Sequence, residues 1–106
     1  MFNAHTDTVD VEGMRDPFSG DVRQGKVYGR GAVDMKGSVA AMLSAMRTLA
    51  ASGVRLHGDV VFAAVADEEH GSLGTRDVIR LGPKVDAAIV TEVSELCLSV
   101  DIPYVS

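Results

Sequence analysis

An apolar run that ends abruptly in three acidic residues places the strongest constraint on how this chain folds. Residues 60–65 are Val-Val-Phe-Ala-Ala-Val, and Asp67, Glu68 and Glu69 follow after a single alanine. A continuous apolar run without alternation predicts a strand buried on both faces, here from Asp59 to Ala66. Carboxylates held side by side repel one another unless a cation keeps them ionised. The sequence therefore predicts a buried strand that delivers acidic side chains to a cation.

The composition is that of a small globular chain of ordinary polarity. It has 106 residues, of which 46% are hydrophobic and 24% charged, enough for one domain with a modest core. The net charge of −5 argues against a nucleic-acid partner, which would require a basic face. No apolar stretch approaches the roughly 20 residues of a membrane span, and no signal peptide is visible. We therefore expect no membrane partner. Cys97 is the single cysteine, so no internal disulfide can form, and we expect a cytoplasmic protein.

The best-defined element is a helix that we expect to begin between Asp34 and Ser38 and to end at Ser52-Gly53. Its apolar residues recur at spacings of three and one, which places them in one stripe along a helix. The expected stripe, with its methionines in the core, is Val39, Met42, Leu43, Met46, Leu49 and Ala50.

Further elements are expected on both sides of this helix. A second helix should run from a cap at Ser72 to Leu81, with Val78 and Ile79 directed inward and Gly82-Pro83 as its end. The expected strands, besides Asp59–Ala66, are one that ends within Met1–Ala4, a brief one at Lys26–Tyr28, a buried one at Asp86–Thr91 and a half-exposed one at Leu96–Ile102.

Strands separated by helices define the fold class as α/β, with a mostly parallel sheet and flanking helices. Sites in such sheets lie outside the carboxyl ends of the strands. His and carboxylate side chains follow three expected strands, and another carboxylate lies where the long helix is expected to begin. These are His5 and Asp7, the pair Glu68 and Glu69, Glu92, and Asp34. We therefore expect segments far apart in the sequence to converge on one edge of the sheet.

These side chains suit a hydrolytic metal site, which needs deprotonated ligands and an open position for water. His5 fits as a nitrogen ligand, and Asp7 could fix its tautomer by accepting the other ring N–H. Asp34 could bridge two metal ions about 3.5–4 Å apart. Glu69 and Glu92 could each bind one metal ion.

Glu68 would then be the general base that removes a proton from metal-bound water. Each candidate also has a simpler explanation, because short His-x-Asp motifs and paired glutamates are common on solvated surfaces. His57 is expected in an exposed turn, and His70 is a loop residue beside the acids. The case for a site depends on the convergence of the whole set.

Four segments together closely resemble the co-catalytic zinc peptidase family of acetylornithine deacetylase, succinyl-diaminopimelate desuccinylase, aminoacylase and glutamate carboxypeptidase. The similarity covers essentially the whole chain. The four segments are His5-Thr6-Asp7-Thr8-Val9, Tyr28-Gly29-Arg30-Gly31-Ala32-Val33-Asp34-Met35-Lys36-Gly37, Asp67-Glu68-Glu69-x-Gly71 and Thr91-Glu92.

The resemblance implies two zinc ions, with cobalt or manganese as alternative metals. It makes His5 a ligand of one zinc and Asp34 a bridge between both, and it places a cis peptide bond after Asp34. Asp7 would orient His5. The remaining implied roles are base for Glu68, ligand of one zinc for Glu69 and ligand of the other for Glu92.

The family's enzymes are several times longer than this chain. They contain a lid domain that often dimerises and a returning catalytic segment, and both contribute a His that has no counterpart here. Val93 also replaces a proline that often follows the family's glutamate. We therefore expect residues 1–106 to be a fragment of a single metal-dependent catalytic domain, without the lid domain and C-terminal catalytic segment, whose parent could be a homodimer.

The activity implied for the parent is zinc-dependent hydrolysis of an amide bond in N-acyl amino acids or small peptides, as in a deacetylase or desuccinylase. Carboxypeptidase or dipeptidase activity of the parent is an alternative. Two other hypotheses come from different classes: a catalytically incomplete fragment that only binds metal, and a magnesium-dependent phosphate enzyme with oxygen ligands.

Overall fold

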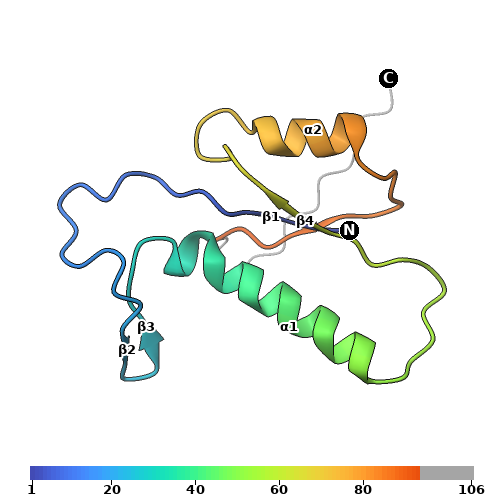
Figure 1. The fold of residues 1–106 in the computed structure, drawn as a ribbon, viewed down its shortest axis with the longest axis horizontal. Helices are drawn as coiled ribbons and strands as arrows, with labels where there is room; N and C mark the ends of the chain where they lie inside the picture. Colours follow the sequence, from blue (N-terminus) through green and yellow to red (C-terminus); the bar gives the residue numbers. More distant parts are fainter. Residues whose placement is uncertain (94–106) are drawn as a thin grey trace.

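A three-stranded parallel sheet forms the centre of the fold (Figure 1). The computed structural model describes residues 1–93, so the expected strand Leu96–Ile102 and Cys97 lie outside the described residues. The elements in chain order are β1 (Phe2–His5), β2 (Val22–Arg23), β3 (Lys26–Val27), a π-helical turn η1 (Ala32–Lys36), α1 (Gly37–Ala51), β4 (Phe62–Val65), α2 (Leu73–Leu81) and β5 (Ile89–Val90).

The sheet has the order β4-β1-β5, and both pairings are parallel. β1 is central because Phe2 pairs with Phe62 on one side and with Ile89 on the other. The helices α1 and α2 lie on opposite sides of this sheet (Figure 1), and they contact β1 and β4 respectively. The predicted α/β class with a parallel sheet and flanking helices is confirmed.

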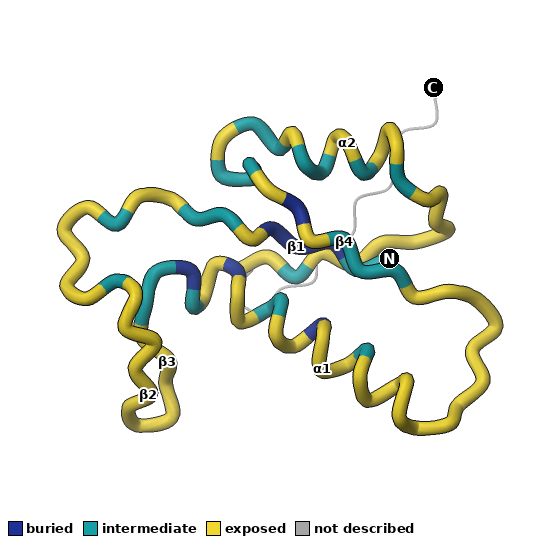
Figure 2. Tube along the Cα trace, in the orientation of Figure 1, coloured by how far each residue is buried: buried dark blue, intermediate teal, exposed yellow. Residues whose placement is uncertain are grey.

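The core lies between β1 and the beginning of α1. Ala4, Met35 and Met42 are buried, and half-buried apolar side chains pack around them. The buried residues lie in β1, at the end of β4, in and just before η1, and at Met42 in α1 (Figure 2). Successive residues of a strand point to opposite faces, so Ala4 enters this core while its neighbour His5 faces away from it. The partly buried residues that pack against the core are Phe2, Val39 and Phe62.

The apolar stripe of α1 is less covered than its spacing predicts. Met42 is 3% exposed, whereas Leu43 and Leu49 are 48% and 37% exposed. The helix runs beyond the short strands (Figure 1), so the sheet covers only its amino-terminal half. Its end is followed by Gly53, as expected, with a φ of 70° that glycine adopts without strain.

Two strand predictions overestimated both length and burial. β4 is limited to Phe62–Val65, and only Val65 in it is fully buried. β5 contains only Ile89 and Val90, which are 55% and 57% exposed. β5 lies at the edge of the described sheet, whereas α1 packs on β1 and α2 packs on β4. The apolar runs therefore predicted where strands lie but not how completely they are covered.

The start and the inner face of α2 also differ from expectation. Ser72 has a left-handed backbone with a φ of 55° and provides no side-chain cap. The carboxylate of Asp67 instead accepts the N–H of Leu73 at 3.3 Å. Ile79 was predicted to point inward but is 77% exposed, because the half-buried side of α2 includes Val78. The helix ends at Leu81, before Gly82, as predicted.

The segment between β1 and α1 contains two local structures. The predicted strand near residue 26 is confirmed as β3, which pairs antiparallel with β2 in a hairpin that projects away from the sheet (Figure 1). Gln24 and Gly25 both have positive φ angles, as a two-residue hairpin turn requires.

The turn η1 contains the expected cis peptide bond, between Asp34 and Met35. Asp34 has φ and ψ angles of −110° and 102°, so it lies before the helix and not in its first turn. α1 itself begins at Gly37, within the predicted range. Within the described part of the chain, no helix combines the length and apolar character needed to cross a membrane.

Candidate metal centre

The centre of the candidate site is the imidazole of His5, the last residue of β1. His5 is 2% exposed, and its Nε2 lies 2.9 Å from Oδ1 of Asp34. The two residues are 29 positions apart, and the η1 turn carries Asp34 to the carboxyl end of β1. The central strand β1 and the irregular turn η1 together bring His5 and Asp34 into contact.

Two more carboxylates reach the same ring nitrogen. Oε1 of Glu92 lies 3.6 Å from Nε2 of His5, and Oε2 of Glu68 lies 3.8 Å from it. One donor atom each from His5, Asp34 and Glu92 fall within 4.8 Å of one another. The carboxylate side chains are 39–52% exposed, so the cluster opens to solvent. Strand ends and one turn thus converge, as the order of elements led us to expect.

The other ring nitrogen of His5 faces Asp7. Nδ1 lies 3.0 Å from the backbone carbonyl oxygen of Asp7 and 3.5 Å from its carboxylate oxygen Oδ1. The shorter contact is to the backbone, so an Nδ1–H would be accepted by the carbonyl and not by the carboxylate that we expected to receive it. Either way Nδ1 faces an acceptor, which leaves Nε2 free to face Asp34.

The carboxylate of Asp7 is held by the loop that follows β4. Its Oδ2 accepts the backbone N–H of Glu69 at 3.3 Å, while its Oδ1 is buried without a hydrogen-bond partner. Burial raises the pKa of Asp7, but backbone N–H groups of Glu68, Glu69 and Asp7 itself and the nearby His5 outweigh burial and lower it. Asp7 is therefore ionised, and it ties the end of β1 to the loop that carries Glu68.

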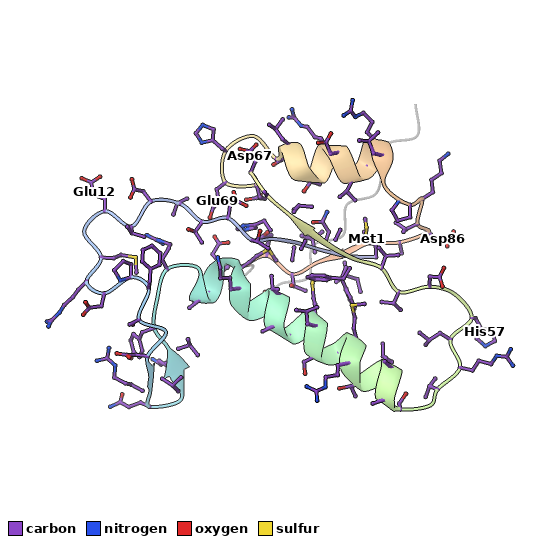
Figure 3. All side chains as sticks on the ribbon, in the orientation of Figure 1. Met1, Glu12, His57, Asp67, Glu69 and Asp86 are labelled. Atoms are coloured by element: carbon purple, nitrogen blue, oxygen red, sulfur yellow. The ribbon has the colours of Figure 1, made fainter. Side chains whose placement is uncertain are left out.

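Glu69 lies apart from the ring of His5. Its Oε1 accepts the backbone N–H of Val9 at 3.3 Å. Figure 3 shows Glu69 and Asp67 in the loop that follows β4, whereas His57 lies on the loop after α1, far from them. His57 and His70 are both exposed. Of the predicted ligands, the structure brings His5, Asp34 and Glu92 together and places Glu69 beside the outgoing chain of β1.

The crowding of carboxylates changes how the cluster titrates. Burial favours neutral His5, but its hydrogen bond to Asp34, the Asp7 carbonyl and the charges of Glu92 and Glu68 outweigh burial and raise its pKa. Burial also raises the pKa of Glu92, and the neighbouring carboxylates raise it further against the opposing effect of His5. Negative charge is therefore in excess here, and a cation would relieve it.

The donor set fits a divalent metal ion. A neutral imidazole nitrogen with carboxylate oxygens is a combination used by zinc and other first-row metals. His5 has its second nitrogen fixed by Asp7, as ligating histidines usually have. Asp34 has the shortest carboxylate distance to His5, and about half of its side chain is exposed.

Three residues that sequence reasoning missed connect the parts of the site. The backbone N–H of His5 donates to the sulfur of Met35 at 3.2 Å, and Nζ of Lys36 donates to the carbonyl of Thr6 at 2.8 Å. The third is Ser38, whose hydroxyl donates to the carbonyl of Thr91 at 2.6 Å. No sequence pattern could have found these contacts, because each joins a side chain to a backbone group at least 30 residues away.

The fold and the cluster together define a parallel α/β domain with a histidine–carboxylate centre at the carboxyl ends of its strands. The sequence model of the family described as "Peptidase family M20/M25/M40" matches residues 1–102, and the chain belongs to this family. The resemblance predicted from the four motifs is thus confirmed.

Two curated relatives of the chain carry different names. It is 41% identical over 98 residues to the N-formyl-4-amino-5-aminomethyl-2-methylpyrimidine deformylase of Halalkalibacterium halodurans, a match that covers 89% of the chain and 23% of the relative. It is 39% identical over 102 residues to the succinyl-diaminopimelate desuccinylase of Alkalilimnicola ehrlichii, which covers 88% of the chain and 27% of the relative. The chain spans about a quarter of the length of these relatives.

Proposed function

We propose that this chain is part of a metal-dependent hydrolase that cleaves the amide bond of a small N-acyl substrate. The single observation that carries the proposal is the convergence of Asp34, Glu92 and Glu68 on Nε2 of His5. The names of the relatives support it, because removal of a formyl or a succinyl group from nitrogen is in both cases cleavage of an amide. N-acyl amino acids, and N-acyl amines more broadly, are the substrates that we infer.

In this proposal His5, Asp34 and Glu92 would hold one zinc ion, and Glu69 would be a ligand of a second. Bound zinc would supply positive charge that activates water and polarises the amide carbonyl. Cobalt or manganese could serve in its place, since both accept the same kinds of ligand. The protein is then a small-molecule enzyme, with no role for nucleic acid.

Glu68 is the residue we propose as general base. Its carboxylate is the one near His5 that is left over when the other two act as ligands, and it is accessible from solvent. It would take a proton from the attacking water and later deliver that proton to the leaving amine, which cannot depart as an anion at neutral pH. Asp7 would keep the imidazole of His5 oriented through both steps.

We also propose that residues 1–106 form part of a single catalytic domain that the remaining chain of a longer protein completes. Within residues 1–93, His5 is the one histidine at the cluster, since His57 and His70 are exposed elsewhere. That observation favours a second candidate for the chain in isolation, a fragment that binds one metal ion and has no activity. Carboxypeptidase or dipeptidase activity is an alternative for the whole protein. We further propose that the whole protein is a homodimer.

The test compares Glu68→Ala with Glu12→Ala in the longer protein. Glu12 is an exposed acid on the loop after β1, away from the cluster (Figure 3), so it controls for loss of one negative charge. Metal content and turnover of N-formyl, N-acetyl and N-succinyl substrates are measured for both variants. We expect Glu68→Ala to retain its metal and to lose at least about 100-fold in turnover, as removal of a general base does. Substantial residual turnover in that variant would refute the role of Glu68.

A further inference from the structure

The pairing of β1 with β5 stops one step before the site. Asn3 pairs with Val90, and the N–H of Ile89 donates to the carbonyl of Met1 at 2.9 Å. In a parallel ladder, bonds of this kind recur every second residue along each strand. In the same register the N–H of Asn3 faces the carbonyl of Ile89, and two residues further on the N–H of His5 would face the carbonyl of Thr91.

Both groups of this missing bond are bound by the segment between η1 and α1. The N–H of His5 donates to the sulfur of Met35, and the carbonyl of Thr91 accepts the hydroxyl of Ser38. Met35 is fully buried in the core, so its sulfur is a fixed acceptor. The segment thereby replaces one ladder bond with two bonds to its own side chains, and it separates the ends of β1 and β5.

This separation occurs where Glu92 leaves the sheet. Glu92 follows Thr91 directly, and the residue pairing between β1 and β5 ends at Asn3 and Val90. The hydroxyl of Ser38 is thus the contact that fixes the backbone immediately before the Glu92 carboxylate. Ser38 lies in the first turn of α1, and Asp34 lies just before that helix. The carboxylates of Asp34 and Glu92 are therefore both positioned by the segment at the start of α1.

We propose that Ser38 is a positioning residue that sets the Glu92 carboxylate relative to His5 and Asp34. It contacts neither the metal nor the substrate, and it acts by holding the Thr91 carbonyl away from the N–H of His5. The proposal rests on the proposed metal centre, because positioning of Glu92 is measured through metal binding. It gives a serine at this position a role that its place in a helix start does not imply.

The experiment titrates cobalt into the metal-free longer protein and follows both the visible absorption of the bound ion and the heat of binding. Ser38→Ala removes the hydroxyl, and Ser38→Thr retains it. Ser52→Ala is the matched control, because the hydroxyl of Ser52 donates to the Leu49 carbonyl at 2.7 Å at the far end of the same helix. Glu92→Ala establishes which part of the binding depends on that carboxylate.

We expect Ser38→Ala to weaken the Glu92-dependent binding by about tenfold, a common effect of losing a group that orients a ligand. Ser38→Thr should restore it, and Ser52→Ala should bind as the parent does. Equal affinities of Ser38→Ala and the parent would overturn the positioning role and leave the metal centre intact. A parent that binds no cobalt, or binds it without dependence on Glu92, would overturn the metal centre and this inference with it.

A second measurement tests the opened ladder without any metal. Met35→Leu frees the N–H of His5, and Ser38→Ala frees the carbonyl of Thr91, so in the double variant the two groups can bond to each other. We expect the double variant to lose less stability in urea than the sum of the two single losses, as coupled sites do. Strict additivity would show that the two groups do not meet and would overturn the proposed ladder opening.

Discussion

Replacing Met35 by leucine tests whether its sulfur stabilises the end of β1. Met35 and Met42 belong to the same buried cluster with Ala4 and are 0% and 3% exposed. Met35 accepts the N–H of His5, whereas no hydrogen bond to the sulfur of Met42 is found within residues 1–93. Met35→Leu and Met42→Leu therefore make the same change in volume and polarity at two equally buried positions, and only one of them removes an acceptor.

The expected difference follows from the environment of the N–H group. A methionine-to-leucine exchange in a core usually costs less than about 1.5 kcal/mol, and this cost is common to both variants. Met35→Leu in addition leaves the buried N–H of His5 without a partner, which costs about 1–3 kcal/mol. The carbonyl of Thr91 is already bound by Ser38 and cannot readily replace the sulfur. Met35→Leu should therefore be less stable than Met42→Leu by about 1–3 kcal/mol.

Urea denaturation of the longer protein, followed by circular dichroism, measures the two free energies of unfolding. Hydrogen exchange at the His5 amide provides a local reading, because an N–H without a partner should exchange faster in Met35→Leu alone. A difference between the variants of less than about 0.5 kcal/mol, with unchanged exchange at His5, would refute the reasoning.

Three further predictions concern packing, pH and metal. A methyl group at Gly74 would lie 2.5 Å from the carbonyl oxygen of Ala66, so Gly74→Ala should destabilise the protein by about 1–3 kcal/mol. Gly58→Ala should not, because no atom lies within 4 Å of a methyl group there. Equal melting temperatures of the two variants would contradict this prediction. The pKa of His5 is raised above 6.5, so in the metal-free protein its protonation stabilises the fold fully below pH 6.5, and this stabilisation is lost as pH rises through the raised pKa. An NMR titration midpoint of His5 below pH 6.5 would contradict this prediction. Zinc at about 100 times its dissociation constant should add about 2.7 kcal/mol to the stability of the metal-free protein, and a chelator should remove it. A His5→Ala variant that gains as much from zinc would argue against the site.

The sequence predicted the architecture because alternating strands and helices leave few arrangements. Apolar runs located β4 and β5, and helical spacing located α1 and α2. The burial of these elements could not be predicted in the same way, because it depends on which neighbours cover each face. Ile79 shows this, since it has the apolar character of a core residue and is exposed in the structure.

Most of the ligands predicted from the sequence lie in the candidate cluster, with Glu69 as the exception, but their contacts were not predicted. His5 and Glu92 were found because polar residues that directly follow strands lie at one edge of a parallel sheet. That Glu68 and not Glu69 would face Nε2 of His5 depends on the exact turn after β4. The carbonyl of Asp7, which comes closer to Nδ1 than its carboxylate does, was likewise set by the path of the chain beyond β1.

The sequence alone therefore determined the family and the α/β class, and it predicted His5, Asp34, Glu68 and Glu92 as candidates at the sheet edge. Only the tertiary structure decided how these groups are held, because hydrogen bonds across 30 to 62 residues depend on strand register and on the irregular η1 turn. The Met35 sulfur and the Ser38 hydroxyl have no periodic pattern of their own. Both act where the pairing of β1 with β5 stops and the candidate site begins, which is a property of the folded chain.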